Sequence, residues 1–274
     1  MKGNRFEGLS DDEWQLLEIF LPKEPEKKGK PHTPWREVCN SLLWILINGA
    51  RWCDLPKGDQ WASRSATHRW LGTWQANGTL ERILAAIREQ AELKGLLNFE
   101  RLAVDGFFSA GKGGGQLIDY GYKGKGVTTH LLTDGNGNPI NFEVTSAKGD
   151  ERQQVGKLLD SIEEFTHRRY LLNGLIPIFE ADKGYDAEEL RDKLLRRKIF
   201  PFIPYRRIDA AKKTEKIICN LAKWRWKVER AIAWLQRKFR RLVVRWERRL
   251  SYWKGFLTFS LIFFWIDKLK TLSG

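Results

Sequence analysis

Over roughly the first 95 residues, apolar positions recur every three to four residues, which is the period of amphipathic helices. In LSDDEWQLLEIFLP, Ser10 is followed three residues later by Glu13, the pattern of a helix-capping box. The next stretch, TPWREVCNSLLWILINGA, offers Thr33 as a cap and Pro34 at the first helical position. Two further helices follow, separated by NGT. The pattern predicts an all-helical, helix-turn-helix-like domain over residues 1–96.

After residue 100 the pattern changes to short apolar runs. ERLAVDGFF is one, and GVTTHLLTDGNGNPINFEVTSA gives two strand-like runs around a hairpin turn. LIPIFEAD and KIFPFIPY predict two more strands, which alternate with helices in DERQQVGKLLDSIEEF and YDAEELRDKLLRR. A long helix is expected over about 215–247, then a buried helix around 256–266. A three-stranded meander followed by alternation predicts an α+β fold, with a mixed β-sheet flanked by helices, over residues 97–274.

The distribution of charge along the chain predicts a class of binding partner. The net charge is +14, and residues 206–254 hold 17 Lys and Arg against four Asp and Glu, so nearly the whole surplus lies in that segment. So dense a cationic segment predicts a polyanionic partner, most simply nucleic acid. A solvated basic helix and an anionic membrane surface are the alternatives. The three cysteines form no CxxC pair, which predicts neither a zinc site nor a disulfide framework.

Two acids directly follow predicted strands: Asp105 in LAVDG and Asp182 in IFEADKG. Functional sites in open α/β sheets gather outside strand ends, and an acid there is costly unless it is solvated, paired or bound to metal. An Asp in such a place is also a common helix cap. Because Asp186 is better placed to cap the next helix, we expect Asp182 to be free of that role.

A third acid, Glu229, stands alone among eight Lys and Arg residues in KWRWKVERAIAWLQRKFRR. It borders a helical stripe of apolar residues at 221, 224, 228, 232, 235, 239 and 242. Arg225, one turn earlier, offers it an ordinary surface ion pair. The sharper interpretation is that two strand-end carboxylates and one helix carboxylate together hold two Mg²⁺ (or Mn²⁺) ions, which suit phosphodiester chemistry.

These segments, taken in order, resemble a known family. GARWCDLP with WASRSATHRWLGTWQANGTLERIL, then LAVDG, YGYKGKGVTTHLLTDGNGNPINFEVTSAKGDERQ, FEADKGYDAEELRDKL and RWKVERAIAWLQRKFRRLVVRWERR are similar to bacterial insertion-sequence transposases of the IS5 type, in the IS4-like group of DDE enzymes. The resemblance implies an RNase H-like catalytic domain over 97–274, with Asp105, Asp182 and Glu229 as the catalytic, metal-binding triad, and a DNA-binding domain over 1–96.

The resemblance also implies an activity. A transposase of this mobile element would bind terminal inverted repeats, cleave DNA and transfer strands to target DNA, as a homodimer or larger assembly in the bacterial cytoplasm, with the nucleoid. The alternatives are a metal-dependent nuclease without strand joining and an inactive DNA-binding relative. The expected contacts to double-stranded DNA are Arg225, Arg230, Arg237, Arg240, Arg241, Lys123 and Lys125. The glycine run GKGGG lacks the P-loop spacing, so no nucleotide cofactor is expected.

The chain departs from the family signature around the glutamate, which is Tyr, two residues, Arg, three residues, Glu, six residues, then Lys or Arg. Arg225 and Glu229 fit this spacing. The Tyr position is Ala222, and the Lys or Arg position is Gln236, with Arg237 adjacent. We therefore expect an intact triad with an altered phosphate contact near its helix.

Overall fold

The computed structural model describes residues 6–24, 32–163, 174–206 and 225–273. The chain forms two compact units. The first comprises residues 1–94, 111–116 and 235–274, and the second comprises 95–110 and 117–234. The expected division at residue 96 differs from these units because 235–274 belong with the N-terminal helices. The expectation that residues 1–96 read DNA stays a prediction.

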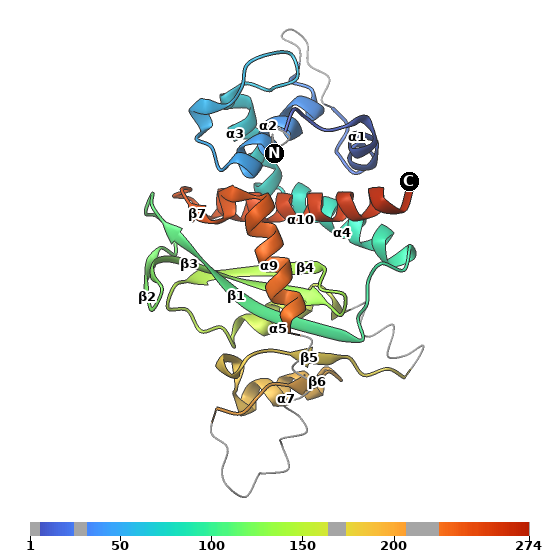
Figure 1. Ribbon diagram of the computed structural model, residues 1–274, viewed down its shortest axis with the longest axis vertical. Helices are drawn as coiled ribbons and strands as arrows, with labels where there is room; N and C mark the ends of the chain where they lie inside the picture. The colour runs from blue at the N-terminus through green and yellow to red at the C-terminus, as the bar shows by residue number, and fades with distance from the viewer. Residues whose placement is uncertain (1–5, 25–31, 164–173, 207–224, 274) are drawn as a thin grey trace, which may run out of the picture. The chain divides into compact units, whose positions relative to one another are not determined.

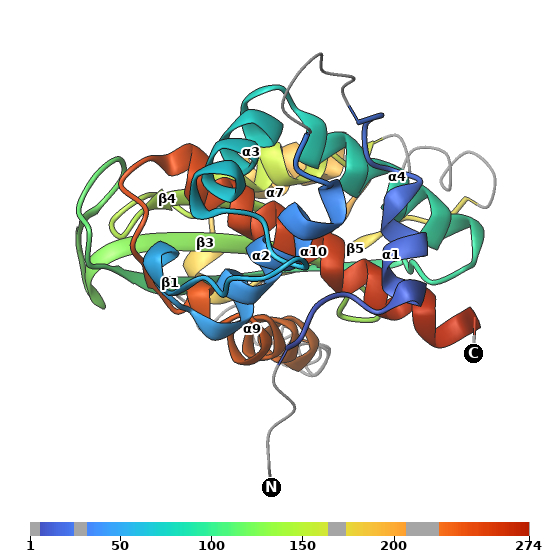
Figure 2. The ribbon, with the colours of Figure 1, turned by 90° about the horizontal axis from the view of Figure 1, so that it is seen from above.

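The first unit is almost entirely helical. Its elements are α1 (Asp11–Glu18), α2 (Trp35–Asn48), the 3-10 turn η1 (Trp52–Asp54), α3 (Arg64–Ala76), α4 (Thr79–Leu93), the 3-10 turn η5 (Arg240–Leu242), the short strand β7 (Val244–Arg245) and α10 (Leu250–Ser273). Helix α10 packs against α1, α3 and α4 (Figures 1 and 2). Its side chains Trp253, Phe256 and Trp265 are fully buried, which confirms the predicted buried helix. No helix of the described residues is both long and apolar enough to span a membrane.

Two helix starts show how local sequence sets boundaries. The Ser10 hydroxyl accepts from the Glu13 N–H, and the Glu13 carboxylate accepts from the Ser10 N–H, so the predicted capping box is present. The predicted start of α2 is wrong by one residue, because Pro34 lies outside the helix in extended backbone. The Trp35 N–H is instead satisfied by the Glu24 carboxylate at 2.8 Å, a partner from outside the helix.

The second unit is built on a mixed sheet. Its elements are β1 (Arg101–Gly111), β2 (Asp119–Gly121), β3 (Gly124–Asp134), β4 (Pro139–Ser146), α5 (Gln154–Asp160), β5 (Ile178–Glu180), the 3-10 turn η2 (Lys183–Tyr185), α7 (Glu188–Arg196), β6 (Phe200–Phe202) and the first part of α9 (Trp226–Lys238). The spatial order is β4-β3-β1-β5-β6 (Figure 1). Strands β4, β3 and β1 are antiparallel, whereas β5 runs parallel to β1 and β6 parallel to β5. The predicted α+β, RNase H-like sheet is therefore confirmed.

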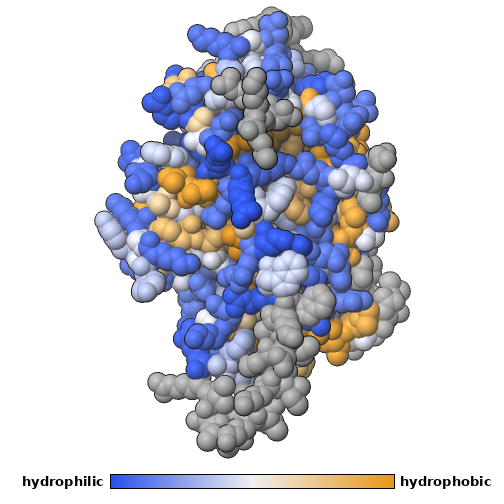
Figure 3. All heavy atoms as spheres, viewed as in Figure 1, coloured by the Kyte–Doolittle hydropathy of each residue, from blue (hydrophilic) through white to orange (hydrophobic). Residues whose placement is uncertain are grey.

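The sequence did not reveal β2, which pairs with the start of β3, because DYG contains no apolar run. Helix α5 packs on β4, and α7 packs on β6. On the face drawn in Figure 3, hydrophilic side chains predominate and apolar ones form separate patches.

The predicted helix over 215–247 is wrong at its C-terminal end, because α9 stops at Lys238. Its predicted start falls in 207–224, outside the described residues. After α9, the Arg241 guanidinium is buried, donates from Nε to the Glu247 carboxylate at 2.9 Å and donates to the Ala50 carbonyl at 2.7 Å. The Lys112 N–H donates to the Arg245 carbonyl. These long-range bonds favour an irregular path over the continuous helix that local pattern predicts.

Candidate active site

The expectation that Asp105 directly follows a strand is wrong, because β1 continues to Gly111. Asp105 lies within β1, where it pairs in register with Leu131 of β3. Its side chain is 22% exposed, and Oδ1 accepts a hydrogen bond from the Gly106 N–H at 2.8 Å. Burial raises the pKa of the Asp105 carboxyl above its usual value. The Gly106 N–H and the Arg225 charge oppose that rise, while the charges of Asp182 and Glu229 add to it. The triad predicted from sequence is therefore electrostatically coupled within the second unit.

Asp182 follows β5 and caps the short 3-10 turn η2. Its Oδ1 accepts from the Gly184 N–H at 2.6 Å. The expectation that Asp186 would cap α7 is wrong: Asp186 pairs with Arg191 at 2.9 Å and accepts from the Arg206 N–H at 2.7 Å. Helix α7 begins after Ala187 without a side-chain cap. Asp182 thus has a capping role, yet among the described residues its Oδ2 accepts no hydrogen bond and stays available as a ligand.

Glu229 lies in the first turn of α9, with a side chain that is 57% exposed. The Arg225 guanidinium lies 3.0 Å from the Glu229 carboxylate, so the ordinary ion pair considered from the sequence is present. The same guanidinium nitrogen lies 3.8 Å from Asp105 Oδ2. One cation therefore links the acid on the helix to the acid on the strand.

The start of α9 is anchored to the turn between β3 and β4. Lys227 donates to the Gly135 carbonyl, and Arg230 donates to the Asn136 carbonyl at 3.4 Å. Val228, which faces inward from the same turn of helix, is fully buried. These contacts fix the rotation of the helix, and they leave Glu229 at the border of the buried stripe, as predicted. Residues 221 and 224 of that stripe, and the signature position Ala222, lie outside the described residues.

A fourth carboxylate, Glu151, belongs to this cluster and was missed by sequence reasoning. It lies between β4 and α5. A Cβ at Gly184 would lie 2.6 Å from Asp182 Oδ1 and 3.4 Å from Glu151 Oε2, so the two carboxylates flank the same backbone. Burial and the charges of Asp182 and Asp105 raise the pKa of Glu151, while the Lys123 charge opposes the rise. The sequence pattern places Glu151 in the helix predicted for DERQQVGKLLDSIEEF, and this is wrong, because α5 begins only at Gln154.

Beneath these acids lies a buried polar chain. His130 on β3 is fully buried, with Nε2 2.9 Å from the Thr145 hydroxyl and Nδ1 3.4 Å from the Tyr185 hydroxyl. Burial lowers the pKa of His130 to about 4, so its ring is neutral at pH 7. The pKa of Tyr185 is raised by burial and by the charges of Glu151, Asp105 and Asp182. His130, Thr145 and Tyr185 are thus uncharged at pH 7, and they do not offset the charges of the neighbouring acids.

The predicted DNA contacts differ in exposure. Arg230, Arg237 and Arg240 are exposed, and Arg230 lies 4.6 Å from the centre of the half-exposed Trp226 ring. Lys123, in the turn joining β2 and β3, and Lys125, at the start of β3, are also exposed.

Arg241 differs from these cations because it is buried against Glu247. Its guanidinium is engaged internally, so we leave it out of the DNA contacts proposed below.

The carboxylates of this site have the chemistry to bind a divalent cation, but they do not lie close enough together to form a complete site. Carboxylate oxygens are the ligands that Mg²⁺ prefers. The pKa values of Asp105 and Glu151 are raised mainly by burial and in smaller part by neighbouring acids, and a cation would offset both effects. Across the described ranges, however, no group of three or more Asp, Glu, His or Cys side chains lies close enough together to hold an ion. The Arg225 guanidinium takes the cationic place between Asp105 and Glu229.

Comparison with protein-family models decides the family. A model described as "Transposase DDE domain" matches residues 98–259, more than half of the chain. The chain belongs to the DDE transposase family. A second model, "Putative transposase of IS4/5 family", matches residues 9–84. The resemblance drawn from the sequence motifs, a DDE transposase of the IS4/5 type, is confirmed.

Individual relatives of this DDE transposase are partial matches. It is 36% identical over 132 residues to the putative transposase for insertion sequence element IS402 of Burkholderia cepacia, covering 48% of this chain and 59% of that protein. It is 34% identical over 93 residues to the uncharacterized protein y4sN of Sinorhizobium fredii, covering 33% of this chain and 71% of that one. The chain therefore spans about three fifths of the length of the IS402 relative.

Solved structures resemble this DDE transposase only distantly. The catalytic domain of Mos1 mariner transposase covers 72% of this chain and 90% of its own, at 17% identity and a TM-score of 0.29. A pre-cleavage Mos1 transpososome covers 86% of this chain and 82% of its own, at 12% identity and the same TM-score. The RNase H-like assignment rests on the strand order and directions of the chain itself.

Proposed function

We propose that the protein is an insertion-sequence transposase that binds the terminal inverted repeats of its element, cleaves DNA at those ends and transfers the strands to target DNA. The observation that carries the proposal is the placement of Asp105 within β1, Asp182 after β5 and Glu229 in the first turn of α9, on an RNase H-like sheet. The charges of the other two acids act on Asp105. Family membership supports it, as does the IS402 relative, which is named a putative transposase.

In this proposal Asp105 and Asp182 hold a divalent cation, Mg²⁺ or Mn²⁺, with Glu229 and Glu151 available to complete the set for two ions. Such a cation activates a water or 3′-hydroxyl and stabilises the leaving oxygen of a phosphodiester. The chain itself supplies position and charge. The capping bond from the Gly184 N–H orients the Asp182 carboxylate. Arg225 lowers the repulsion between Asp105 and Glu229.

Double-stranded DNA is the proposed partner, and its phosphates would meet exposed cations. Arg230, Arg237 and Arg240 lie on or just after the helix that carries Glu229. Lys123 lies on the β2–β3 turn, and Lys125 lies at the start of β3. One distantly similar solved structure is the Mos1 transposase paired-end complex with left transposon end. Two ends must be brought together for transposition, so we propose that the active form is at least a homodimer.

A second reading is an inactive relative that binds DNA without cutting it. The observation in its favour is that no three-ligand group is assembled among the described residues, while Arg225 occupies the place between two of the acids. A nuclease that cuts without joining would use the same acids and is distinguished only by its products.

Cleavage of a linear DNA carrying the gene with its natural flanks tests these readings. Wild type, Asp182→Asn and Asp160→Asn are compared with Mg²⁺ and with Mn²⁺. Asp160 is a matched control because it is an exposed acid of the same unit, paired with Arg197 away from the cluster. The proposal predicts cuts at defined ends by wild type and Asp160→Asn, followed by joined products, and none by Asp182→Asn. Binding without cuts in all three would favour the inactive relative.

A further inference from the structure

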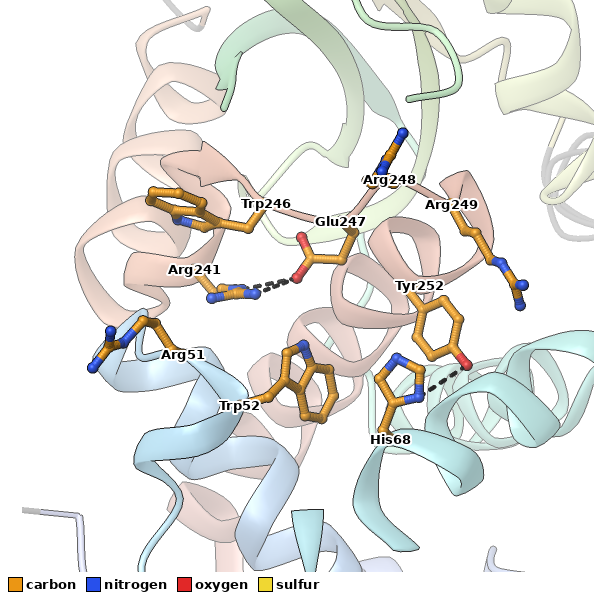
Figure 4. A pocket seen from close by; sticks show the side chains of 9 residues that line it. All are labelled: Arg51, Trp52, His68, Arg241, Trp246, Glu247, Arg248, Arg249 and Tyr252. Carbon is orange, nitrogen blue, oxygen red and sulfur yellow. Dashed lines mark hydrogen bonds and ion pairs between the residues drawn. The ribbon is translucent and has the colours of Figure 1, made fainter. Parts of the chain in front are cut away.

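A second concave site lies in the first unit, which contains none of the triad acids. It is a pocket of about 460 Å³ (Figure 4). Its lining comes from three stretches: Arg51 and Trp52 at η1, His68 on α3, and the segment from Arg241 to Tyr252 that joins α9 to α10. The volume lies within the range of small-molecule sites. No part of the proposed chemistry uses this pocket.

The walls of the pocket are aromatic. The His68 and Tyr252 rings are stacked, with centroids 4.2 Å apart and planes at 24°, and the Tyr252 hydroxyl lies 3.2 Å from His68 Nδ1. Trp52 packs edge-on against His68 at 4.9 Å. Figure 4 shows these three rings along one side of the pocket and Trp246 across from them. Trp246 is 51% exposed, so about half of its side chain is open to contact with a ligand.

The charges of the pocket are divided between an inner pair and an outer rim. Arg241 and Glu247 form a buried ion pair and neutralise each other. Arg51 pairs with Asp54. The exposed guanidinium groups of Arg248 and Arg249 form no ion pair with any described residue, so the rim is cationic.

The inner pair also leaves one acceptor unused. Glu247 Oε2 is buried and accepts no hydrogen bond from the described chain. A buried acceptor without a donor is unfavourable, which favours a ligand that brings an N–H to it.

The backbone that carries these side chains is held in place by the glycine run at 111–115. The Lys112 and Gln116 N–H groups donate to the carbonyls of Arg245 and Arg248. A Cβ at Gly113 would lie 2.4 Å from the Trp246 carbonyl oxygen, and one at Gly115 would lie 2.1 Å from that of Arg248. Only glycine permits this approach. The glycine run therefore holds in place the backbone segment that lines one side of the pocket.

We propose that this pocket binds an unpaired nucleotide of DNA. The base would lie among Trp246, Trp52 and the His68–Tyr252 stack, its amino or ring N–H would donate to Glu247 Oε2, and Arg248 and Arg249 would contact the flanking phosphates. Aromatic side chains interleaved with cations bind single-stranded nucleotides because every base offers a π-face. A paired base is excluded, because its faces and its hydrogen-bonding edge are already occupied within the duplex.

The proposal rests on the proposed function only for the choice of DNA as the polymer. A site for phosphate alone would need the rim arginines but neither four aromatic rings nor a buried carboxylate acceptor. That difference makes an abasic probe the informative comparison.

The test uses the full chain in buffer without divalent metal, so that nothing is cut. Three short duplexes of one sequence are compared: fully paired, with a single unpaired 2-aminopurine, and with a single abasic nucleotide at the same place. Wild type is expected to quench the 2-aminopurine fluorescence and to bind that duplex about fivefold or more tighter than the abasic one. Trp246→Ala is expected to lose the quenching and to bind the 2-aminopurine duplex roughly tenfold more weakly, with affinity for the paired duplex unchanged.

Arg248→Ala, which alters the rim without removing an aromatic ring, is compared with Arg69→Ala, an exposed cation next to His68 outside the pocket. Only the former is expected to weaken binding of the bulged duplexes. Equal binding of base and abasic duplexes by wild type, or unchanged quenching in Trp246→Ala, overturns the nucleotide pocket while leaving the proposed function intact. A wild type that binds none of the three duplexes overturns the proposed function itself.

Discussion

The Arg225 guanidinium lies 3.8 Å from the Asp105 carboxylate and so joins the start of α9 to the middle of β1. Through its 3.0 Å contact with Glu229, the same group shields two acids that would otherwise repel each other. It occupies the position in which a bound cation would serve the same purpose. Under the proposed mechanism, the guanidinium would therefore substitute for part of the charge of a bound metal.

Replacing Arg225 should uncover this repulsion. We expect Arg225→Ala to lower the free energy of unfolding by about 0.5–1 kcal/mol at pH 7, the scale of partly exposed ion pairs. The loss should shrink at pH 5, because Asp105, whose pKa is already raised, then begins to take up a proton. Urea unfolding at both pH values measures this, with Arg225→Lys as the charge-preserving control. An equal loss at both pH values would contradict the shielding role.

The ionised Glu151 carboxylate should lower the stability of the folded protein at pH 7. Its pKa is raised in the folded protein, so ionisation at pH 7 opposes folding and the penalty diminishes as pH falls toward the unfolded value. In metal-free buffer at pH 7 we expect Glu151→Gln to raise the melting temperature by about 2 °C or more. The exposed Glu89→Gln serves as control and should change little. A lower melting temperature for Glu151→Gln would show that the carboxylate is a structural anchor.

His130 should act with the opposite sign over the same pH range. Its pKa is lowered to about 4 in the folded protein, whereas an unfolded histidine takes up a proton near 6.5. Stability is therefore lost as pH falls from about 6.5 toward 4, by up to about 1.4 kcal/mol per pH unit. His130→Gln should be less stable than wild type at pH 7.5, with a gap that narrows at pH 5. Parallel curves for the two proteins would refute a neutral, buried imidazole.

The Arg241–Glu247 pair should be costly to break from one side. Both side chains are 3% exposed, so Arg241→Ala leaves a buried carboxylate without its partner. We expect the free energy of unfolding to fall by about 3–5 kcal/mol, measured by urea titration. Removing both charges, as in Arg241→Met with Glu247→Leu, should cost less than Arg241→Ala alone. A loss below about 1 kcal/mol in Arg241→Ala would mean that the pair is open to solvent.

Arg230 should contribute to DNA affinity through charge. If it contacts one phosphate, Arg230→Ala should weaken duplex binding similarly for all sequences and reduce the slope of log affinity against log salt by about 1. Arg196→Ala, an exposed cation at the end of α7, is the matched control. Fluorescence anisotropy across a salt series measures both. An unchanged slope in Arg230→Ala removes this residue from the DNA contacts.

Element boundaries set by neighbouring residues could be predicted from the sequence, whereas boundaries set by long-range contacts could not. Ser10 and Glu13 satisfy each other within one turn, so the start of α1 is readable from four residues. The end of α9 is not, because the bonds of Arg241 reach Ala50 and Glu247. No spacing in the sequence encodes such a contact.

The same limit applies to the candidate site. Asp105 and Glu229 are recognisable because the apolar run before Asp105 and the helical stripe beside Glu229 follow local periodicity, although β1 continues past Asp105. Glu151 did not, since only the fold brings its loop beside Asp182. The sequence favours Asp186 over Asp182 as a cap, because the short 3-10 turn at 183–185, which Asp182 caps, has no apolar pattern of its own.

Because α10 packs against α1, α3 and α4, the first unit cannot complete its core until the end of the chain has been synthesised. The apolar faces of those early helices emerge from the ribosome long before their covering helix exists. At typical translation rates the delay between α4 and α10 is roughly ten to thirty seconds. During that time the apolar faces of α1, α3 and α4 stay uncovered, so we expect chaperones to bind the nascent first unit. Its core is completed only after the segment between α4 and α10, which carries the sheet, has been made.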